Sequence, residues 1–124
     1  MNRSGEAPLI GIVDDDEAVR DSISSLVRSV GLRAMAFPSA EGFLGSNWMH
    51  DFDCLIFDVR MTGLSGLELQ SRLAGMGLPI PVIFATAHDE DDHRARAFDQ
   101  GAVAFLRKPF TDEDLFEAMY SALA

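Results

Sequence analysis

Positive charge is scarce in this sequence, which has 10 Lys and Arg residues against 20 Asp and Glu and a formal net charge of −10. Because contacts with nucleic-acid phosphates require clustered basic residues, this balance argues against a domain that binds DNA or RNA by itself. An acidic balance is compatible with binding a divalent cation, although most of these carboxylates are expected on solvated helix faces.

Cysteines and long apolar runs are also scarce. The single cysteine, Cys54, cannot form an internal disulfide and belongs to no Cys-x-x-Cys motif, which is typical of a reducing compartment. No apolar run approaches the length needed to cross a membrane, and residues 1–8 lack the apolar segment of a signal peptide. We therefore predict a cytoplasmic protein with a disordered N-terminal tail over residues 1–8 and one domain over residues 9–124.

The most informative stretch surrounds Asp58. Four apolar residues, from Cys54 to Phe57, precede this aspartate, and Gly63 and Gly66 follow it. The pattern predicts a buried strand that brings Asp58 to the edge of a sheet, where the chain enters a loop. Because a carboxylate is costly to bury without a partner, we expect other polar groups to surround it.

Strand and helix patterns alternate along the whole chain. Apolar runs bounded by turn residues predict five strands, at about residues 9–13, 33–37, 54–57, 82–86 and 103–106. Helical spacing predicts a helix after the first strand, then helices at residues 40–44, from about Leu67, at residues 87–101, and after Thr111. The helix at residues 87–101 has few apolar residues, so we expect it to be marginally packed and mobile. This alternation predicts an α/β fold in which helices cover both faces of a parallel sheet.

Charged and hydroxyl residues follow four of the predicted strands. In open parallel sheets, ligands bind outside the carboxyl ends of the strands, so these side chains should form one cluster. Neighbouring carboxylates would repel by roughly 4 kcal/mol per pair at an effective dielectric of 20, which favours recruitment of Mg²⁺. A metal, a cation and an in-line carboxylate are the groups that phosphoryl transfer requires. The predicted cluster consists of Asp14, Asp15, Asp58, Thr86 and Lys108.

Four ordered motifs occur over residues 9–124, and they are Val13-Asp14-Asp15, Phe57-Asp58-Val59-Arg60-Met61 with Ser65-Gly66, Thr86-Ala87 and Lys108-Pro109-Phe110. Together they resemble the CheY-like receiver domains of two-component response regulators. The resemblance implies a flavodoxin-like fold, a doubly wound sheet of five parallel strands in the order 2-1-3-4-5. The stretch Phe37–Leu44 looks more particularly like the nitrogen-fixation (FixJ-type) branch, whose members usually carry a C-terminal helix-turn-helix of the LuxR type.

The resemblance also implies a role for each site residue. Asp58 would accept a phosphoryl group from the phosphohistidine of a sensor kinase, from a phosphotransfer protein or from a small phosphodonor. Mg²⁺, or Mn²⁺, would be ligated by Asp15, Asp58 and the backbone carbonyl of Arg60, with Asp14 acting through water. Lys108 and Thr86 would bind the phosphoryl oxygens. Catalysis would be limited to self-phosphorylation and autodephosphorylation.

A switch is implied as well. Phosphorylation would draw the Thr86 hydroxyl inward, Phe105 would rotate into the vacated space, and the change would appear on the face formed by residues 90–123. The Lys108-Pro109 bond resembles the family's cis peptide. Transcriptional output would then pass through a DNA-binding domain outside this chain or through a phosphorylation-dependent homodimer.

Three positions depart from the family pattern or vary within it. Thr62 stands where the family often has proline, which loosens the loop without removing a chemical group. Arg60 and His88, each two residues beyond a motif residue, match positions that tune phosphoryl lifetime in this family. Arg60 could pair with the acid pocket or screen attacking water, and the alternative is that both side chains simply face solvent.

Two other functions remain open. A haloacid-dehalogenase-like phosphatase would use Asp14 as nucleophile, because Asp14-Asp15-Asp16 contains its D-x-D motif. The chain lacks a later aspartate pair after a strand and has no room for a cap domain. A degenerate receiver that serves only as a binding module is the other alternative, which the presence of Asp58, Thr86 and Lys108 opposes.

Overall fold

The computed structural model of the chain describes residues 6–87 and 91–124. In this part of the chain, five parallel strands form one sheet in the order β2-β1-β3-β4-β5, which confirms the predicted fold class and strand order. The strands are β1 (Leu9–Val13), β2 (Arg33–Phe37), β3 (Cys54–Phe57), β4 (Val82–Thr86) and β5 (Ala104–Arg107), and the helices are α1 (Glu17–Ser29), α2 (Ala40–Leu44), α3 (Gly66–Gly75), α4 (Asp91–Asp99) and α5 (Asp112–Leu123).

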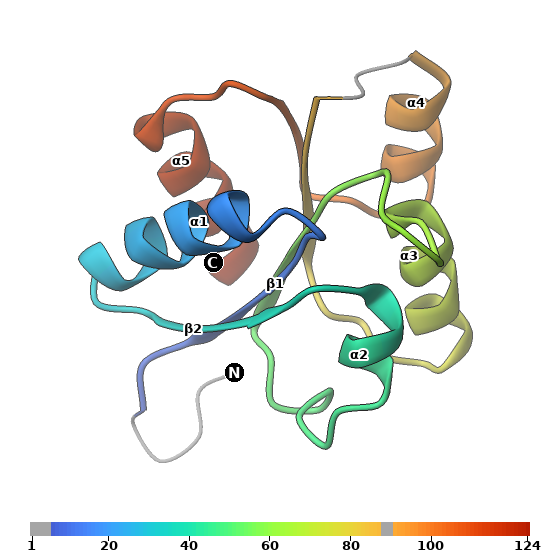
Figure 1. The fold of residues 1–124 in the computed structure, drawn as a ribbon, viewed down its shortest axis with the longest axis horizontal. Helices are drawn as coiled ribbons and strands as arrows, with labels where there is room; N and C mark the ends of the chain where they lie inside the picture. Colours follow the sequence, from blue (N-terminus) through green and yellow to red (C-terminus); the bar gives the residue numbers. More distant parts are fainter. Residues whose placement is uncertain (1–5, 88–90) are drawn as a thin grey trace.

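The helices cover both faces of the sheet. Helices α1 and α5 lie on one face, and α2, α3 and α4 lie on the other (Figure 1). Successive strand residues point to opposite faces, so the fully apolar strands supply two separate cores. In β1, Ile10 and Ile12 pack with the α1 and α5 residues, whereas Leu9 and Val13 pack with those of α2, α3 and α4. Burial on both faces therefore explains why the strands read as continuous apolar runs.

The Phe37–Leu44 stretch ends β2 and forms α2. The Ser39 side chain accepts a hydrogen bond from the Gly42 N–H and caps this short helix. Phe43 is fully buried, and its ring lies edge-on to Phe37 at a centroid distance of 5.3 Å and beside Phe52 at 5.4 Å. Aromatic packing, rather than helix length, therefore holds α2 on the sheet.

Helix α3 begins at Gly66, in agreement with the start predicted at about Leu67, and Ser65 caps it in a capping box with Glu68. The last strand was predicted one residue too early at each end, since β5 spans Ala104–Arg107 rather than residues 103–106. The helix predicted at residues 87–101 is α4, Asp91–Asp99, and the predicted start falls partly on residues 88–90, outside the described part. Its sparse apolar face agrees with expectation, since Ala97 is buried but Phe98 is 41% exposed; its mobility stays a prediction.

Within residues 6–87 and 91–124, no helix combines the length and apolar character required to cross a bilayer.

Replacing the buried ring of α2 tests its contribution. We expect Phe43→Ala to lower the free energy of unfolding by about 3–5 kcal/mol, because it removes ring contacts and leaves a cavity. Urea denaturation measures the loss. The matched control is Tyr120→Ala, whose ring is 71% exposed and should cost less than about 0.5 kcal/mol. Equal losses in the two variants would contradict the assigned packing.

Candidate functional site

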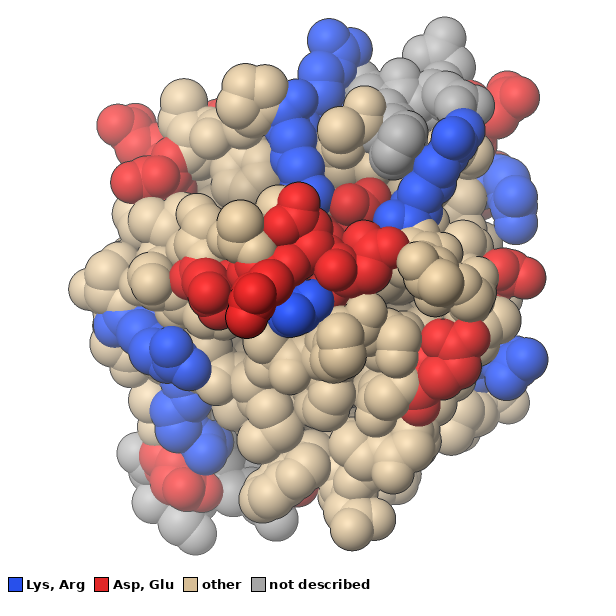
Figure 2. Space-filling view, viewed as in Figure 1, with Lys and Arg blue, Asp and Glu red and all other residues tan. Residues whose placement is uncertain are grey.

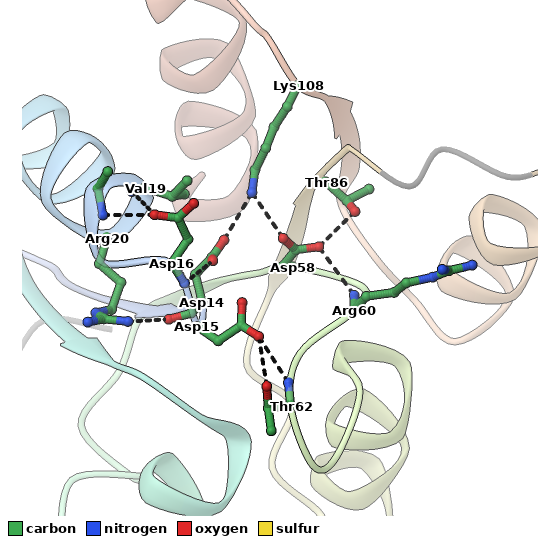
Figure 3. Close-up of polar contacts among 11 residues, drawn as sticks. Asp14, Asp15, Asp16, Val19, Arg20, Asp58, Arg60, Thr62, Thr86 and Lys108 are labelled. Carbon is green, nitrogen blue, oxygen red and sulfur yellow. Dashed lines mark hydrogen bonds and ion pairs between the residues drawn. The ribbon is translucent and has the colours of Figure 1, made fainter.

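The parallel sheet gathers the predicted site residues at one edge. Asp14 and Asp58 follow the neighbouring strands β1 and β3, where the Asp58 N–H donates to the Val13 carbonyl at 3.2 Å. Thr86 ends β4, and the Lys108 N–H donates to the Thr86 carbonyl at 2.8 Å. Figure 3 shows the side chains from these four strand ends pointing toward one another. The structure therefore brings together residues from four separate segments.

The Asp58 carboxylate is held from three directions. Its Oδ2 accepts from the Lys108 ammonium at 3.0 Å, and its Oδ1 accepts from the Thr86 hydroxyl at 2.7 Å and the Arg60 N–H at 3.2 Å. The residue is 8% exposed. Such donors offset the cost of burying a carboxylate and fix its orientation. Asp58 is therefore a largely buried anion with one edge on an open pocket, whose lining includes it.

Asp14 shares the same lysine. The Lys108 ammonium contacts Asp14 Oδ2 at 3.0 Å, and the Asp16 N–H donates to Oδ1 at 2.9 Å. Burial raises the pKa of Asp14, with a smaller contribution from the Asp58 charge, and the bonds from Asp16 and Lys108 oppose this rise. Burial also acts to lower the pKa of Lys108, but its bonds to Asp58 and Asp14 outweigh that effect and raise it. Lys108 therefore remains an ammonium ion near neutral pH.

Asp15 and Asp16 have different environments. Asp15 is exposed, and its Oδ2 accepts from the Thr62 N–H at 3.0 Å and the Thr62 hydroxyl at 3.3 Å. The Asp16 side chain accepts from the Ala18 and Val19 N–H groups and caps α1. The side chains of Asp14 and Asp15 thus line the pocket, whereas the side chain of Asp16 also caps α1.

An acidic surface surrounds the pocket. Figure 2 shows a band of Asp and Glu side chains across the middle of the molecule, bordered by Lys and Arg side chains. An open pocket there is lined by Asp14, Asp15, Asp16, Val19, Asp58, Arg60, Met61, Thr62, Ala87 and Lys108. A more apolar cleft, at the start of β4 and the end of α3, has no titratable side chain in its lining and offers no comparable chemistry.

The loop after Asp58 is held by two residues that sequence reasoning did not single out for this role. The Gly66 N–H donates to the Val59 carbonyl at 2.8 Å, and a Cβ on Gly66 would lie 2.0 Å from the Asp58 carbonyl oxygen. Glu41 of α2 accepts the Leu64 N–H at 2.9 Å, and this bond lowers the pKa of Glu41. Both residues stood inside the quoted motifs, but nothing in the sequence indicated their contacts with this loop.

Arg20 makes a third contact that the sequence did not indicate, between α1 and the loop after β1. Its Nη1 donates to the Asp14 backbone carbonyl at 2.8 Å, which ties α1 to the end of β1. Spacing alone could not separate this arginine from the solvated charges of the helix.

Arg60 is one of the two residues predicted to tune phosphoryl lifetime, and it lies beside Asp58. The Arg60 backbone bonds to Asp58, while its side chain extends away from the Asp58 carboxylate (Figure 3). His88 lies outside the described residues.

The two residues predicted to form a switch, Thr86 and Phe105, both point inward. The Thr86 hydroxyl contacts Asp58, and Phe105 is buried, with its ring 5.8 Å from that of Phe84. The Arg94 guanidinium lies 5.7 Å from the Phe105 ring and 5.3 Å from that of Phe98. The Lys108-Pro109 peptide bond is cis, as the resemblance implied.

The donor set of the pocket suits a hard cation. Among the described residues, no three Asp, Glu, His or Cys side chains converge as a ready metal site. Lys108 bridges Asp14 and Asp58, and Thr62 holds Asp15. The carboxylate, hydroxyl and carbonyl donors around the pocket are nevertheless oxygens, and Asp14 and Asp58 share the single ammonium of Lys108 between two carboxylates. These residues therefore fit Mg²⁺, which prefers carboxylate, carbonyl and water oxygens.

The fold and pocket together define a doubly wound α/β domain with an acidic site at the carboxyl ends of its strands. The family model of response regulator receiver domains matches residues 10–120. The chain belongs to this family and is the receiver domain of a two-component response regulator.

Relatives and solved structures agree with this assignment. The response regulator protein TmoT of Ectopseudomonas mendocina is 47% identical over 123 residues, which cover 99% of this chain and 56% of TmoT. The transcriptional regulatory protein FixJ of Bradyrhizobium diazoefficiens is 39% identical over 92% of this chain and 56% of its own length. The crystal structure of FixJ-N superposes with a TM-score of 0.85 at 34% identity, covering 99% of this chain and 95% of FixJ-N. The chain thus spans about half the length of these curated relatives.

Gly66 allows a direct test of the loop. We expect Gly66→Ala to lower the free energy of unfolding by about 1–3 kcal/mol, because the new methyl group meets the Asp58 carbonyl and the backbone must shift. The matched control is Gly75→Ala in the same helix, where a Cβ would meet nothing within 4 Å. That variant should gain up to about 1 kcal/mol from helix propensity. Thermal denaturation of both variants measures the contrast, and similar changes in both would refute the close approach at Gly66.

Lys108 should couple stability to pH. The raised pKa of Lys108 means that its stabilisation is present below its ordinary pKa of 10.5 and is lost as the pH rises through the raised value. Lys108→Met should therefore cost about 2–3 kcal/mol near neutral pH, because Asp14 and Asp58 lose their shared cation. The cost should shrink as the pH falls through the raised pKa of Asp14.

Urea denaturation near neutral pH and at about pH 4.5 measures this difference. Arg28→Met, on the exposed surface of α1, serves as the control for removal of a charge. A cost of Lys108→Met that does not change with pH would contradict the assigned charge cluster.

Proposed function

We propose that this receiver domain accepts a phosphoryl group on Asp58 and that the modification biases a two-state surface. The arrangement of the Asp58 carboxylate carries the proposal. One of its oxygens contacts the Lys108 ammonium and the other contacts the Thr86 hydroxyl, while the pocket gives access from solvent. A buried carboxylate with this access and these donors suits nucleophilic attack on phosphorus.

The reaction transfers one group between two covalent partners. A carboxylate oxygen of Asp58 forms a bond to phosphorus as the phosphorus–nitrogen bond of a phosphohistidine breaks, and the leaving imidazole takes up a proton. The phosphohistidine belongs to a sensor kinase or a phosphotransfer protein. In a small phosphodonor such as acetyl phosphate, a phosphorus–oxygen bond breaks instead. The domain thus modifies itself and turns over no separate substrate, apart from the later hydrolysis of its own acyl phosphate.

The surrounding residues stabilise the charge on the transferred group. Lys108 is protonated and lies beside the attacking carboxylate, so its ammonium can shift to the phosphoryl oxygens as they arrive. The Thr86 hydroxyl offers a further donor from the other side. Thr86 and Lys108 therefore lie on either side of the acceptor before transfer.

Bound Mg²⁺ would supply positive charge to the equatorial phosphoryl oxygens. Asp15, Asp58 and the backbone carbonyl of Arg60 would hold it directly, and Asp14 would act through water. For Asp14 and Asp58 this requires that Lys108 yield part of its contact with them, because its ammonium now bridges the two carboxylates.

The output is proposed to use the face formed by α4, β5 and α5. Thr86 and Phe105 form the switch, and the observed inward arrangement supports a population shift toward a conformation already accessible to the chain. Because the curated relatives are about twice as long as their matched regions, a LuxR-type DNA-binding domain is proposed to lie outside this sequence. Phosphorylation-dependent dimerisation is the other proposed output.

We also propose a domain organisation and a cellular location for the protein. Residues 9–124 are proposed as the receiver domain, after a tail at residues 1–8, and the protein is proposed to act in the cytoplasm. Arg60 and His88 are proposed to tune the lifetime of the phosphoryl group.

The phosphatase alternative is less compatible with the site. Its nucleophile would be Asp14, which is only 2% exposed. Asp58 is less buried and carries the donors expected around a phosphoryl acceptor.

Intact-mass spectrometry with Mg²⁺ and acetyl phosphate tests the proposal. The wild type should gain one phosphoryl mass that hydroxylamine removes, as an acyl phosphate requires, and Asp58→Asn should fall to background. Asp112→Asn, an exposed carboxylate at the start of α5, should leave uptake unchanged. Uptake that survives in Asp58→Asn but disappears in Asp14→Asn would favour the phosphatase. Absence of uptake in the wild type would indicate a binding module.

A further inference from the structure

A hydrogen-bonded bridge joins the two loops that surround the acid pocket. One loop follows β1 and carries Asp15, and the other follows β3 and carries Arg60 and Thr62. Thr62 donates twice to the same carboxylate oxygen, Asp15 Oδ2, from its N–H at 3.0 Å and from its hydroxyl at 3.3 Å. These residues are 47 positions apart in the sequence, so the contact is a tertiary one.

The bridge leaves the other oxygen of Asp15 available. Both donors bind Oδ2, and Figure 3 shows the second oxygen pointing away from Thr62 into the space between Asp14 and Asp58. Asp15 and Thr62 both line the acid pocket. A free carboxylate on an exposed loop would sample several rotamers and would be pushed outward by Asp14 and Asp58. The two hydrogen bonds from Thr62 to Asp15 Oδ2 restrict the rotamers of Asp15 and hold its carboxylate against this repulsion.

We infer that Thr62 is a positioning residue for cation binding, which holds Asp15 by one oxygen so that the other faces the acid pocket. The inference rests on the proposed function, in which Asp15 ligates a divalent cation. Hydrogen bonds to the non-ligating part of a metal ligand commonly orient it and strengthen binding. Because Thr62 stands two residues after Arg60, the bridge also fixes the backbone that presents the Arg60 carbonyl.

This contact is particular to the residue at position 62. The proline that receiver domains often carry there has neither an N–H nor a hydroxyl, so it could not make either bond. Threonine in place of proline at position 62 therefore loosens the loop but also adds two hydrogen-bond donors to Asp15.

Direct measurement of cation affinity tests the inference. Mn²⁺ is the probe, and room-temperature electron paramagnetic resonance counts the free ion during titration of the unmodified domain. Thr62→Val preserves the shape and the N–H but removes the hydroxyl, and we expect it to raise the Mn²⁺ dissociation constant about threefold. Thr62→Ser, which retains both donors, should restore the wild-type value.

A double-mutant cycle with Asp15→Asn separates positioning from a general effect on the loop. In the Asp15→Asn background, Thr62→Val should cause no further loss, because the carboxylate that Thr62 holds is gone. Unchanged affinity in Thr62→Val, or the same loss in both backgrounds, would overturn the inference. Tighter binding in Thr62→Val would overturn it as well, because Thr62 would then compete with the cation for Asp15.

The same samples separate this inference from the proposed function. If the wild type binds Mn²⁺ and the cycle behaves as expected but acetyl phosphate adds no phosphoryl group, the phosphoacceptor role fails and the positioning role stands. If phosphorylation proceeds but Thr62→Val binds Mn²⁺ like the wild type, only the positioning role fails. A wild type that binds no Mn²⁺ refutes the positioning role.

Discussion

The ammonium of Lys108, shared between Asp14 and Asp58, is the interaction on which the rest of the site depends. Two largely buried carboxylates lie next to each other because β1 and β3 are neighbours in the sheet, and each would be costly to bury alone. Lys108 comes from β5, at the far edge of the sheet, so its side chain must reach across the end of β4. A long, unbranched side chain with a compact charge suits this reach better than a planar guanidinium.

Lys108 orders the two carboxylates of the pocket without removing the whole cost of burying them. Its bond to Asp14 lowers the pKa of that carboxyl group, but burial outweighs this effect and the pKa remains raised. A second cation beside the same carboxylates would further offset the cost of burying them. The neighbouring loop contributes backbone order, through the approach of Gly66 to Asp58 and the bond from Leu64 to Glu41, so the acidic residues are not left on flexible supports.

The sequence predicted most of the fold because its signals were local and consistent. The central strands were continuous apolar runs, and Asp58, Thr86 and Lys108 were recognisable as strand-end residues before their contacts were known. The contacts that the sequence did not reveal depend on how the folded chain brings its loops together. No repeating sequence pattern marks the residues that make these contacts. They are the close approach of Gly66 to the Asp58 carbonyl, the hydrogen bond from Leu64 to Glu41 and the hydrogen bonds from Thr62 to Asp15. The inward position of Thr86 is similarly a choice among rotamers, which composition and pattern do not determine.

The sheet separates two packing layers of different character. Ring contacts run along one side, from Phe37 through Phe43 and Phe57 to Phe84 and Phe105, whereas the opposite side is packed mainly with aliphatic residues of the strands, α1 and α5. Substitutions in one layer share few neighbours with those in the other, so their effects should be nearly additive. The packing beneath α1 can thus be altered by substitution without repacking the aromatic rings on the other side of the sheet.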